Sequence, residues 1–306
     1  MVVTTGVVTT GVVTTGVVKM GPFIAVDWGT TNRRAFRIED GNGIATERDD
    51  RGAANVAAGD YEAEVAGIRN RLGDLPMLLA GMVGSNIGWR SVPYVAAPAG
   101  LTDVAAALER IDDRTAIVPG LSYRDGLHAD VMRGEEVQLL GAVAAGLVPS
   151  DATLCQPGTH CKWATLQAGA ILSFTTAMTG ELFALLRAHG VLSRQLGHPV
   201  EPGAAFLEGV AEGAKRDLAA SLFAIRARGV LGIADDVHAA SFASGLLIGA
   251  DTAARIMPGE AVHVLADPAL GALYASAIDA LGGTSHHIDS QAAFMAGITR
   301  IQELAA

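Results

Sequence analysis

The chain is poor in cysteine and in positive charge, and both shortages exclude classes of protein. Its two cysteines, Cys155 and Cys161, are too few for a disulfide framework and lack the spacing of a zinc site. They flank a Pro-Gly turn, and we expect both to be buried thiols in a reducing cytoplasm. A formal net charge of −10 argues against a surface that binds nucleic acid or an anionic membrane. The longest apolar run, 137–148, is too short to span a bilayer.

Aromatic residues are also scarce, at 5% of the chain, whereas half of the residues are apolar and 37 are glycine. Small apolar side chains allow helices to pack closely on sheets, so the composition favours the α/β class. With 306 residues, the chain can form one large or two medium domains with an ample core.

Residues 1–19 are a low-complexity tail in which Val-Val-Thr-Thr-Gly occurs at 2–6, 7–11 and 12–16. The tail lacks the basic start and the continuous apolar core of a signal peptide. We expect Met20 to be the natural start of the protein. The tail would then be duplicated or upstream-translated sequence that forms at most an extended or disordered arm.

The stretch 23–38 predicts a buried strand, a tight polar turn and a second strand. Asp27 ends the first strand, and the turn after it contains Gly29, Thr30 and Thr31. A glycine lets a phosphate approach the backbone, threonines offer N–H and O–H donors, and an aspartate is able to hold Mg²⁺ through water. The stretch therefore indicates a turn that binds a metal-bound polyphosphate. The alternative is an ordinary hairpin with the same residues in its turn.

A second strand-turn-strand unit, later in the chain, has Gly158 and Thr159 at its tip. Between the two units, an apolar strand at 76–82 runs into the glycine-rich loop 81–90. In open α/β sheets, such loops at the carboxyl ends of strands form the ligand crevice. Two halves that each begin with a hairpin and a phosphate turn predict two lobes that close on a nucleotide.

The remaining elements follow from capping residues and periodicity. We expect further strands at 44–48, 115–118, 153–156, 162–166, 171–176, 260–266 and 285–288. We expect helices over 60–72 and 102–111, a helix that opens within 130–141, mostly helical structure over 179–254, and helices over 268–281 and 289–306.

A family resemblance is carried by five ordered blocks, at 25–35, 81–98, 130–141, 157–163 and 178–186. The first block resembles the first phosphate motif of the sugar kinase, Hsp70 and actin superfamily. The five blocks together resemble the 2-dehydro-3-deoxygalactonokinase family.

The resemblance implies a two-lobed ribonuclease-H-like fold, as in actin-like ATPases, with the active site in the cleft between the lobes. It implies ATP and Mg²⁺ as cofactors and transfer of a phosphoryl group to 2-dehydro-3-deoxygalactonate, giving the 6-phosphate in galactonate or galactose catabolism. The lobes are expected at 20–130 and 131–289, with the helix at 290–306 packing back on the first. We expect a cytoplasmic enzyme, for which a homodimer is possible.

The resemblance also implies roles for residues at the nucleotide. Carried over by position, the residues around the β- and γ-phosphates and Mg²⁺ are Asp27, Gly29, Thr30 and Thr31, with Gly158 and Thr159 as the second phosphate motif. Lys162 lies beside the second motif. Asp267 stands where superfamily members usually have a Gly-Gly pair, and it is able to accept a ribose hydroxyl.

Phosphoryl transfer needs a carboxylate that accepts the proton of the acceptor hydroxyl. Related sugar kinases place an aspartate just after a glycine at the start of a helix, and Gly134 followed by Glu135 matches that place. Glu135 is therefore the first candidate base and Asp130 the second. For either acid, the alternative role is that of a capping or first-turn carboxylate.

A sugar acid carries a carboxylate, which favours arginine as its ligand because a guanidinium makes paired hydrogen bonds. The arginines in suspected site segments are Arg33, Arg34, Arg90 and Arg133. The other candidate substrate contacts are Asn32, Gly84, Ser85, Asn86, Trp89 and Tyr94. Trp89 has interlobe packing as its alternative role, and we expect His160 in the second turn to be structural.

Other functions fit the same fold. One is a kinase of another sugar or keto-deoxy sugar acid, and another is a non-catalytic sugar sensor or regulator. A regulator of this kind needs a basic helix-turn-helix or a zinc-cysteine cluster, and the sequence shows neither. An Hsp70-like ATPase is disfavoured because the chain is too short.

Overall fold

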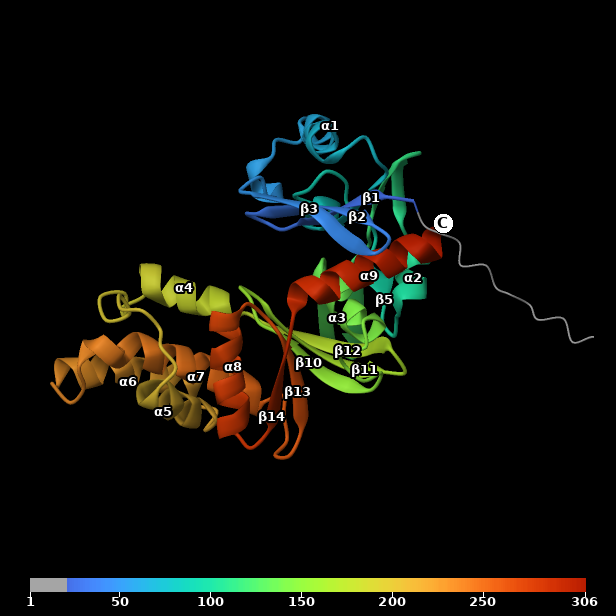
Figure 1. Ribbon diagram of the computed structural model, residues 1–306. Coiled ribbons are helices and arrows are strands. Elements are labelled where there is room, and N and C mark those ends of the chain that lie inside the picture. Colours follow the sequence, from blue (N-terminus) through green and yellow to red (C-terminus); the bar gives the residue numbers. More distant parts are fainter. Residues whose placement is uncertain (1–20) are drawn as a thin grey trace, which may run out of the picture.

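The computed structural model describes residues 21–306, and the expectations for residues 1–19 and for Met20 as the start lie outside them. Two mixed β-sheets form the centre of the molecule, and helices cover their faces (Figure 1). The α/β class predicted from composition is confirmed.

The first sheet has the strand order β3-β2-β1-β4-β7-β6. Its strands are β1 (Phe23–Trp28), β2 (Arg33–Glu39), β3 (Asn42–Asp49), β4 (Met77–Gly81), β6 (Glu109–Asp112) and β7 (Thr115–Ile117). Strand β1 pairs antiparallel with β2 and parallel with β4, so it lies inside the sheet. The hairpin predicted over 23–38 is confirmed.

The second sheet has the order β12-β11-β10-β13-β14. Its strands are β10 (Ala152–Gln156), β11 (Cys161–Gln167), β12 (Ala170–Ala177), β13 (Ala261–Leu265) and β14 (Thr284–Ile288). In both sheets one strand joins an antiparallel hairpin to a parallel neighbour, as two hairpin-led halves predict. A third, small sheet contains β5 (Val95–Ala96), β8 (Leu121–Asp125) and β9 (His128–Met132).

The helices are α1 (Tyr61–Leu72), α2 (Leu101–Ala106), α3 (Glu135–Ala144), α4 (Thr179–His189), α5 (Ala204–Gly213), α6 (Leu218–Val230), α7 (Ala239–Ala253), α8 (Pro268–Ala280) and α9 (Ser290–Ala305). Three short 3-10 turns are η1 (Ala53–Asn55), η2 (Met82–Gly84) and η3 (Asp236–His238). Helices α4 to α7 gather outside the second sheet (Figure 1). Over residues 21–306, every helix is too short or too polar to cross a membrane.

Strand β1 is apolar on both faces because each face is covered. Successive side chains of a strand point to opposite faces, so Phe23 and Ala25 enter the core that contains Phe294 of α9. Ile24 and Val26 enter the core that contains the buried face of α1. Burial on both sides is typical of a strand inside a sheet, and it places the end of β1 in the middle of the molecule.

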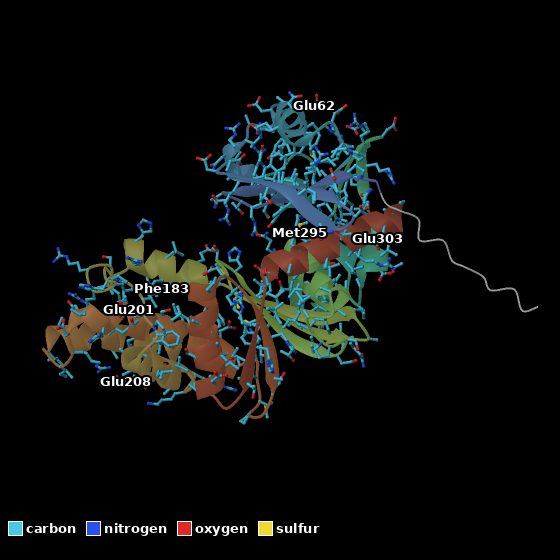
Figure 2. The ribbon with its side chains drawn as sticks, viewed as in Figure 1. Glu62, Phe183, Glu201, Glu208, Met295 and Glu303 are labelled. Atoms are coloured by element: carbon cyan, nitrogen blue, oxygen red, sulfur yellow. The ribbon has the colours of Figure 1, made fainter. Side chains whose placement is uncertain are left out.

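Helices α3 and α9 cross with their backbones in contact. A Cβ atom on Gly141 would lie 2.0 Å from the carbonyl oxygen of Ala293, and one on Gly297 would lie 2.0 Å from that of Val137. Met295 of α9, labelled in Figure 2, packs partly buried against the core of the first sheet. The C-terminal helix therefore contacts the first sheet and α3 together. The lobe boundaries at 130/131 and 289/290 stay a prediction.

One helix prediction between residues 100 and 135 is wrong. The helix predicted over 102–111 ends at Ala106, because 109–112 form β6 and pair antiparallel with β7. The helix predicted to open within 130–141 is confirmed and begins at Glu135, while the β8–β9 hairpin before it, whose second strand is 128–132, was not predicted. Both missed strands are decided by hydrogen bonds from a partner strand, which local periodicity does not reveal.

Replacing Gly141 with alanine tests the backbone contact between α3 and α9. We expect Gly141→Ala to lower the free energy of unfolding by about 1–3 kcal/mol, because the methyl group must push the two helices apart. Gly67→Ala in α1 is the matched control, since a Cβ there would meet only the flexible end of Arg71, at 3.2 Å. The control should be neutral or stabilising by about 0.5–1 kcal/mol. Urea unfolding measures both, and equal values would contradict the contact.

Candidate active site

A cleft with two arms lies at the carboxyl ends of β1, β4 and β10. One arm, of about 410 Å³, is called the Tyr94 arm, and its lining includes Tyr94, Arg133, Glu135, Gly158, Thr159 and Lys162. The other, of about 340 Å³, is called the Asp267 arm, and its lining includes Thr31, Asn32, Arg34, Arg48, Asp267 and Ser290. Both arms are lined by Asp27, Gly29, Thr30, Gln138, Gln156 and Pro157. The arms therefore meet at the first predicted phosphate turn.

The first turn has its carbonyl groups engaged on one side. The carbonyls of Gly29, Thr30 and Thr31 accept hydrogen bonds from the N–H groups of residues 52–54, at 2.9 to 3.2 Å. A Cβ on Gly52 would lie 2.3 Å from the backbone of Thr31, so the two loops fit directly against each other. Because the carbonyls face that loop, the N–H and hydroxyl groups of the turn are left for an anion in the cleft.

The second turn, 157–160, is held by the start of α4. The N–H of Glu181 donates to the Thr159 carbonyl at 2.9 Å, and a Cβ on Gly180 would lie 2.4 Å from the Gly158 carbonyl oxygen. His160 pairs with Glu181 at 2.6 Å near the surface, which is a structural contact. The structure thus brings both predicted phosphate turns to one cleft.

Asp27 lies where the two arms meet, with its side chain only 15% exposed. Its Oδ2 accepts a hydrogen bond from the Arg34 guanidinium at 2.5 Å, across the β1–β2 pair. Burial raises the pKa of Asp27 above its ordinary value. The charge of Arg34 opposes this shift, and the charge of Glu135 adds to it.

The single carboxylate of Asp27 suits Mg²⁺ better than a metal ion whose ligands are all protein side chains. No group of three metal-ligating side chains occurs within residues 21–306. Mg²⁺ keeps much of its water and is usually held by one or two carboxylates together with substrate phosphates. Asp27, beside the first phosphate turn, supplies such a carboxylate.

Glu135, the first residue of α3, has both carboxylate oxygens oriented. Its Oε1 lies 3.1 Å from Nζ of Lys162, and its Oε2 accepts the backbone N–H of Arg133 at 3.0 Å. The Lys162 side chain is 5% exposed and points from β11 into the Tyr94 arm. The contact between Glu135 and Lys162 therefore joins α3 to β11 of the second sheet, across the cleft.

Glu136 is fully buried, and sequence reasoning did not single it out. Its Oε2 accepts the N–H of Gly134 at 2.7 Å, while Oε1 has no hydrogen-bond partner among residues 21–306. Burial, assisted by the negative charge of Glu135, raises the pKa of Glu136 to about 8. The carboxyl group is therefore protonated at neutral pH. It holds the turn at Gly134, whose φ of 104° favours glycine.

Asp130, the second candidate base, lies outside both arms. Its carboxylate accepts hydrogen bonds from the N–H and the hydroxyl of Thr176, at 2.5 and 2.7 Å. It also accepts the N–H of Val131 at 2.8 Å. Asp130 therefore fastens β9 to β12, and its oxygens are occupied by the protein itself.

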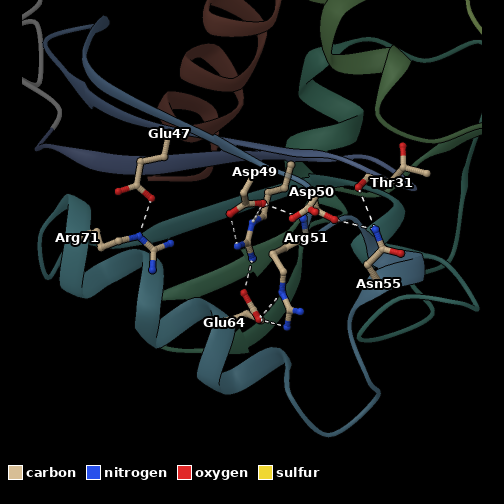
Figure 3. A network of polar contacts seen from close by, with 9 residues as sticks. Thr31, Glu47, Asp49, Asp50, Arg51, Asn55, Glu64 and Arg71 are labelled. Carbon is tan, nitrogen blue, oxygen red and sulfur yellow. Dashed lines mark hydrogen bonds and ion pairs between the residues drawn. The ribbon is translucent and has the colours of Figure 1, made fainter.

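Arg33 does not face the cleft. Its side chain is 2% exposed, and its guanidinium contacts Asp49 at 2.6 Å and Glu64 at 2.9 Å. It also lies 4.6 Å from the centre of the Trp28 ring. Figure 3 shows the surrounding network, in which Glu64 also binds Arg51. Neighbouring residues of β2 point to opposite faces, so Arg34 enters the cleft and Arg33 braces α1.

The loop after η2 also turns away from the cleft. Trp89 stacks on Tyr61, with ring centroids 6.0 Å apart and an interplanar angle of 5°. Arg90 is exposed and lies 3.7 Å from Glu109. The predicted substrate contacts that lie outside the lining of both arms are Arg33, Gly84, Ser85, Asn86, Trp89 and Arg90.

Several polar residues of the cleft were not predicted, among them Gln138, Gln156 and Arg48. Gln156, at the end of β10, donates to the side chain of Gln138 at 3.0 Å, and both line the junction of the arms. Arg48 of β3 is exposed opposite Arg34 and lines the Asp267 arm. Gln138 lies one helical turn after Glu135, a spacing that could have identified it. Arg48 reaches the cleft only because β3 pairs with β2, which no local sequence signal reveals.

Comparison with known proteins identifies the family. The model of the 2-keto-3-deoxy-galactonokinase family matches residues 27–301. The chain belongs to this family. It is 35% identical over 285 residues to the 2-dehydro-3-deoxygalactonokinase of Escherichia coli K12, covering 91% of this chain and 97% of that protein. It is 34% identical over 294 residues to the "Probable 2-dehydro-3-deoxygalactonokinase DgoK1" of Rhizobium meliloti, covering 91% and 96%.

A solved structure supports the same relationship. A candidate 2-dehydro-3-deoxygalactonokinase from Sinorhizobium meliloti matches with a TM-score of 0.85 at 33% identity, over 91% of this chain and 97% of that one. The ribonuclease-H-like, actin-like ATPase fold expected from the resemblance is thereby confirmed for this 2-keto-3-deoxy-galactonokinase family member. The enzyme class is that of a phosphotransferase with an alcohol group as acceptor.

In this kinase family member, the pKa of Glu136 makes stability depend on pH. The pKa is about 8 when folded and 4.5 when unfolded, so the folded chain keeps a proton that the unfolded chain releases. The resulting stabilisation is complete below about pH 4.5 and is lost as the pH rises through about 8, with a slope of at most about 1.4 kcal/mol per unit.

Chemical denaturation at several pH values between about 5 and 9 measures this slope. Glu136→Gln, a neutral isostere, should flatten the dependence. Glu62→Gln, on the exposed face of α1 (Figure 2), is the control and should leave it unchanged. A Glu136→Gln variant with the slope of the parent protein would show that Glu136 is not buried in its protonated form.

Proposed function

We propose that the protein transfers the γ-phosphoryl group of ATP to 2-dehydro-3-deoxygalactonate in the cytoplasm, giving the 6-phosphate. The relative from Escherichia coli is named 2-dehydro-3-deoxygalactonokinase and aligns with 91% of the chain. The observation that carries the proposal is the two-armed cleft, in which the first phosphate turn lines both arms, Gly158 and Thr159 line one arm with Glu135, and Asp267 lines the other. This arrangement suits a nucleotide and an acceptor that meet at the phosphates.

The nucleoside of ATP is assigned to the Asp267 arm. Asp267 is the N-cap of α8, and its Oδ1 accepts the N–H groups of Ala269 and Leu270, each at 3.1 Å. Both bonds use one oxygen, which leaves Oδ2 for a ribose hydroxyl. The β- and γ-phosphates then reach the junction, where the turn at Gly29 offers N–H and hydroxyl donors, with the turn at Gly158 beside it in the Tyr94 arm.

Asp27 would hold Mg²⁺ through water, and the ion would neutralise charge between the β- and γ-phosphates. Arg34 already binds Asp27, and Arg48 lies beside it on the next strand. The charge of Arg48 also acts on Asp27, where it opposes slightly the rise in pKa that burial causes. Arg48 is exposed and lines the Asp267 arm, so it is assigned to an oxygen of the polyphosphate.

Glu135 takes the proton of the acceptor hydroxyl while that oxygen forms a bond to the γ-phosphorus. The bond between the γ-phosphorus and the β–γ bridging oxygen breaks, and ADP leaves. Lys162 contacts Glu135 and lies beside the second turn, so its ammonium group stabilises negative charge on the transferred group. The backbone N–H of Arg133 and the ammonium group of Lys162 hold the two carboxylate oxygens of Glu135, so the base has a fixed orientation.

The acceptor is tested by coupled release of ADP with 2-dehydro-3-deoxygalactonate, its gluconate epimer and simple sugars. We expect turnover of the galactonate compound and little turnover of neutral sugars. If no acceptor supports ADP release, the kinase proposal is contradicted and a non-catalytic sensor is favoured. Equal turnover of the two epimers would contradict only the choice of epimer, and preference for another sugar would indicate the alternative kinase.

Removal of the proton acceptor tests Glu135. Glu135→Gln should lower kcat by about 10²–10⁴-fold and change the KM for ATP little, because the amide keeps the shape but takes no proton. Asp130→Asn is the matched control and should keep most of its kcat, since Asp130 lies outside the cleft. Steady-state kinetics measure both variants. A large loss of kcat in Asp130→Asn alone would reverse the assignment of the base.

A further inference from the structure

Arg133 differs from the other arginines predicted to bind substrate in having no acidic partner. Arg33 pairs with Asp49, Arg34 with Asp27 and Arg90 with Glu109. Within the part of the chain that the structure describes, no carboxylate oxygen lies within 4.0 Å of the Arg133 guanidinium. The positive charge of Arg133 acts to lower the pKa of Glu136, but burial outweighs it and Glu136 is protonated at neutral pH.

The guanidinium of Arg133 is buried with donors unused. The residue is 8% exposed, and it lines the Tyr94 arm. Nη2 donates to the Val92 carbonyl at 2.6 Å, but Nε and Nη1 have no hydrogen-bond partner among residues 21–306. Burying a charge without satisfying its donors is costly, so the fold keeps this group in a state that an anion would stabilise.

The surroundings of Arg133 fix its guanidinium in one place. Its central carbon lies 4.3 Å from the centre of the Tyr94 ring, in a cation–π contact. A Cβ on Gly84 would lie 2.8 Å from Nη1, and a Cβ on Gly120 would lie 2.8 Å from the Tyr94 ring. The two glycines therefore leave room for the stacked pair. This contact explains why Gly84 belongs to the site segment although it lines neither arm.

We infer that Arg133 and Tyr94 form the subsite for the carboxylate of the acceptor, and that this subsite selects sugar acids over neutral sugars. The inference rests on the proposed function and deepens it. A carboxylate oxygen can accept a hydrogen bond from one of the unused N–H donors, and hydrogen bonds between charged groups are the strong ones. The other cation of this arm, Lys162, is already paired with Glu135.

Arg133 and Glu135 line the same arm of the cleft. The backbone nitrogen of Arg133 donates to Oε2 of Glu135 at 3.0 Å, while the guanidinium lies against the Tyr94 ring. An acid held by Arg133 therefore lies in the arm that contains the proposed base.

The test compares the parent enzyme with Arg133→Gln, Arg133→Lys and Arg90→Gln on two acceptors. One acceptor is 2-dehydro-3-deoxygalactonate, and the other is its analogue with the carboxylate reduced to a hydroxymethyl group. Arg133→Gln should lower kcat/KM for the acid by about 10–100-fold, mainly through KM, because a charge-assisted contact is lost. The neutral analogue should change little. Arg133→Lys should lie between, and Arg90→Gln, outside the cleft, should match the parent.

Equal losses of kcat/KM on both acceptors in a folded Arg133→Gln variant would overturn the inference in favour of a structural role. Unchanged kinetics on both would overturn it as well. Thermal unfolding reports whether each variant is folded. If Arg133→Gln is not folded, the kinetics of Arg133→Lys on the two acceptors are compared with those of the parent instead. Calorimetric binding of the acid without ATP separates this inference from the proposed function. Weaker binding to Arg133→Gln supports the subsite even where no ADP is released, and equal binding overturns it.

Discussion

The start of α3 can lie in the cleft only because glycine occupies the positions around it. A Cβ on Gly134 would lie 3.1 Å from the Cα atom of Gly81, and a Cβ on Gly81 would lie 2.6 Å from the carbonyl oxygen of Trp28. The ends of β1 and β4 and the start of α3 are therefore stacked backbone against backbone. Further along α3, Gly141 makes the same kind of contact with α9. Every group that the proposed chemistry uses on α3 depends on these contacts.

Two ion pairs hold the acids that the proposed chemistry uses in the cleft. Asp27 is paired with Arg34 at the junction of the arms, and Glu135 is paired with Lys162 in the Tyr94 arm. These pairs keep the acids accessible to ligands while their positions are held. Among the arginines predicted to contact substrate, only Arg133 lacks such a partner. Because its buried guanidinium keeps unused donors, we assign it to an anion of the substrate.

Several features of the site were visible in the sequence because they depend on local chemistry. The turns at Gly29 and Gly158 were predicted from a glycine and hydroxyl residues after short apolar strands, and the structure brings both to one cleft. Glu135 was predicted from its place after Gly134 at a helix start, and it does begin α3. The hairpin β8–β9 was missed, since its short strands are stabilised by each other rather than by any local periodicity.

The sequence alone determined the α/β class, the positions of the two Gly-Thr turns and the family, because these depend on hydrophobic periodicity, on turn residues and on ordered motif blocks. Tertiary structure alone decided which charged residues face the cleft. Neighbouring positions on a strand point to opposite faces, so Arg33 braces α1 while Arg34 meets Asp27. It also decided that Asp130 fastens two strands and that Arg133 remains unpaired, because a side chain's partners come from elements distant in the sequence.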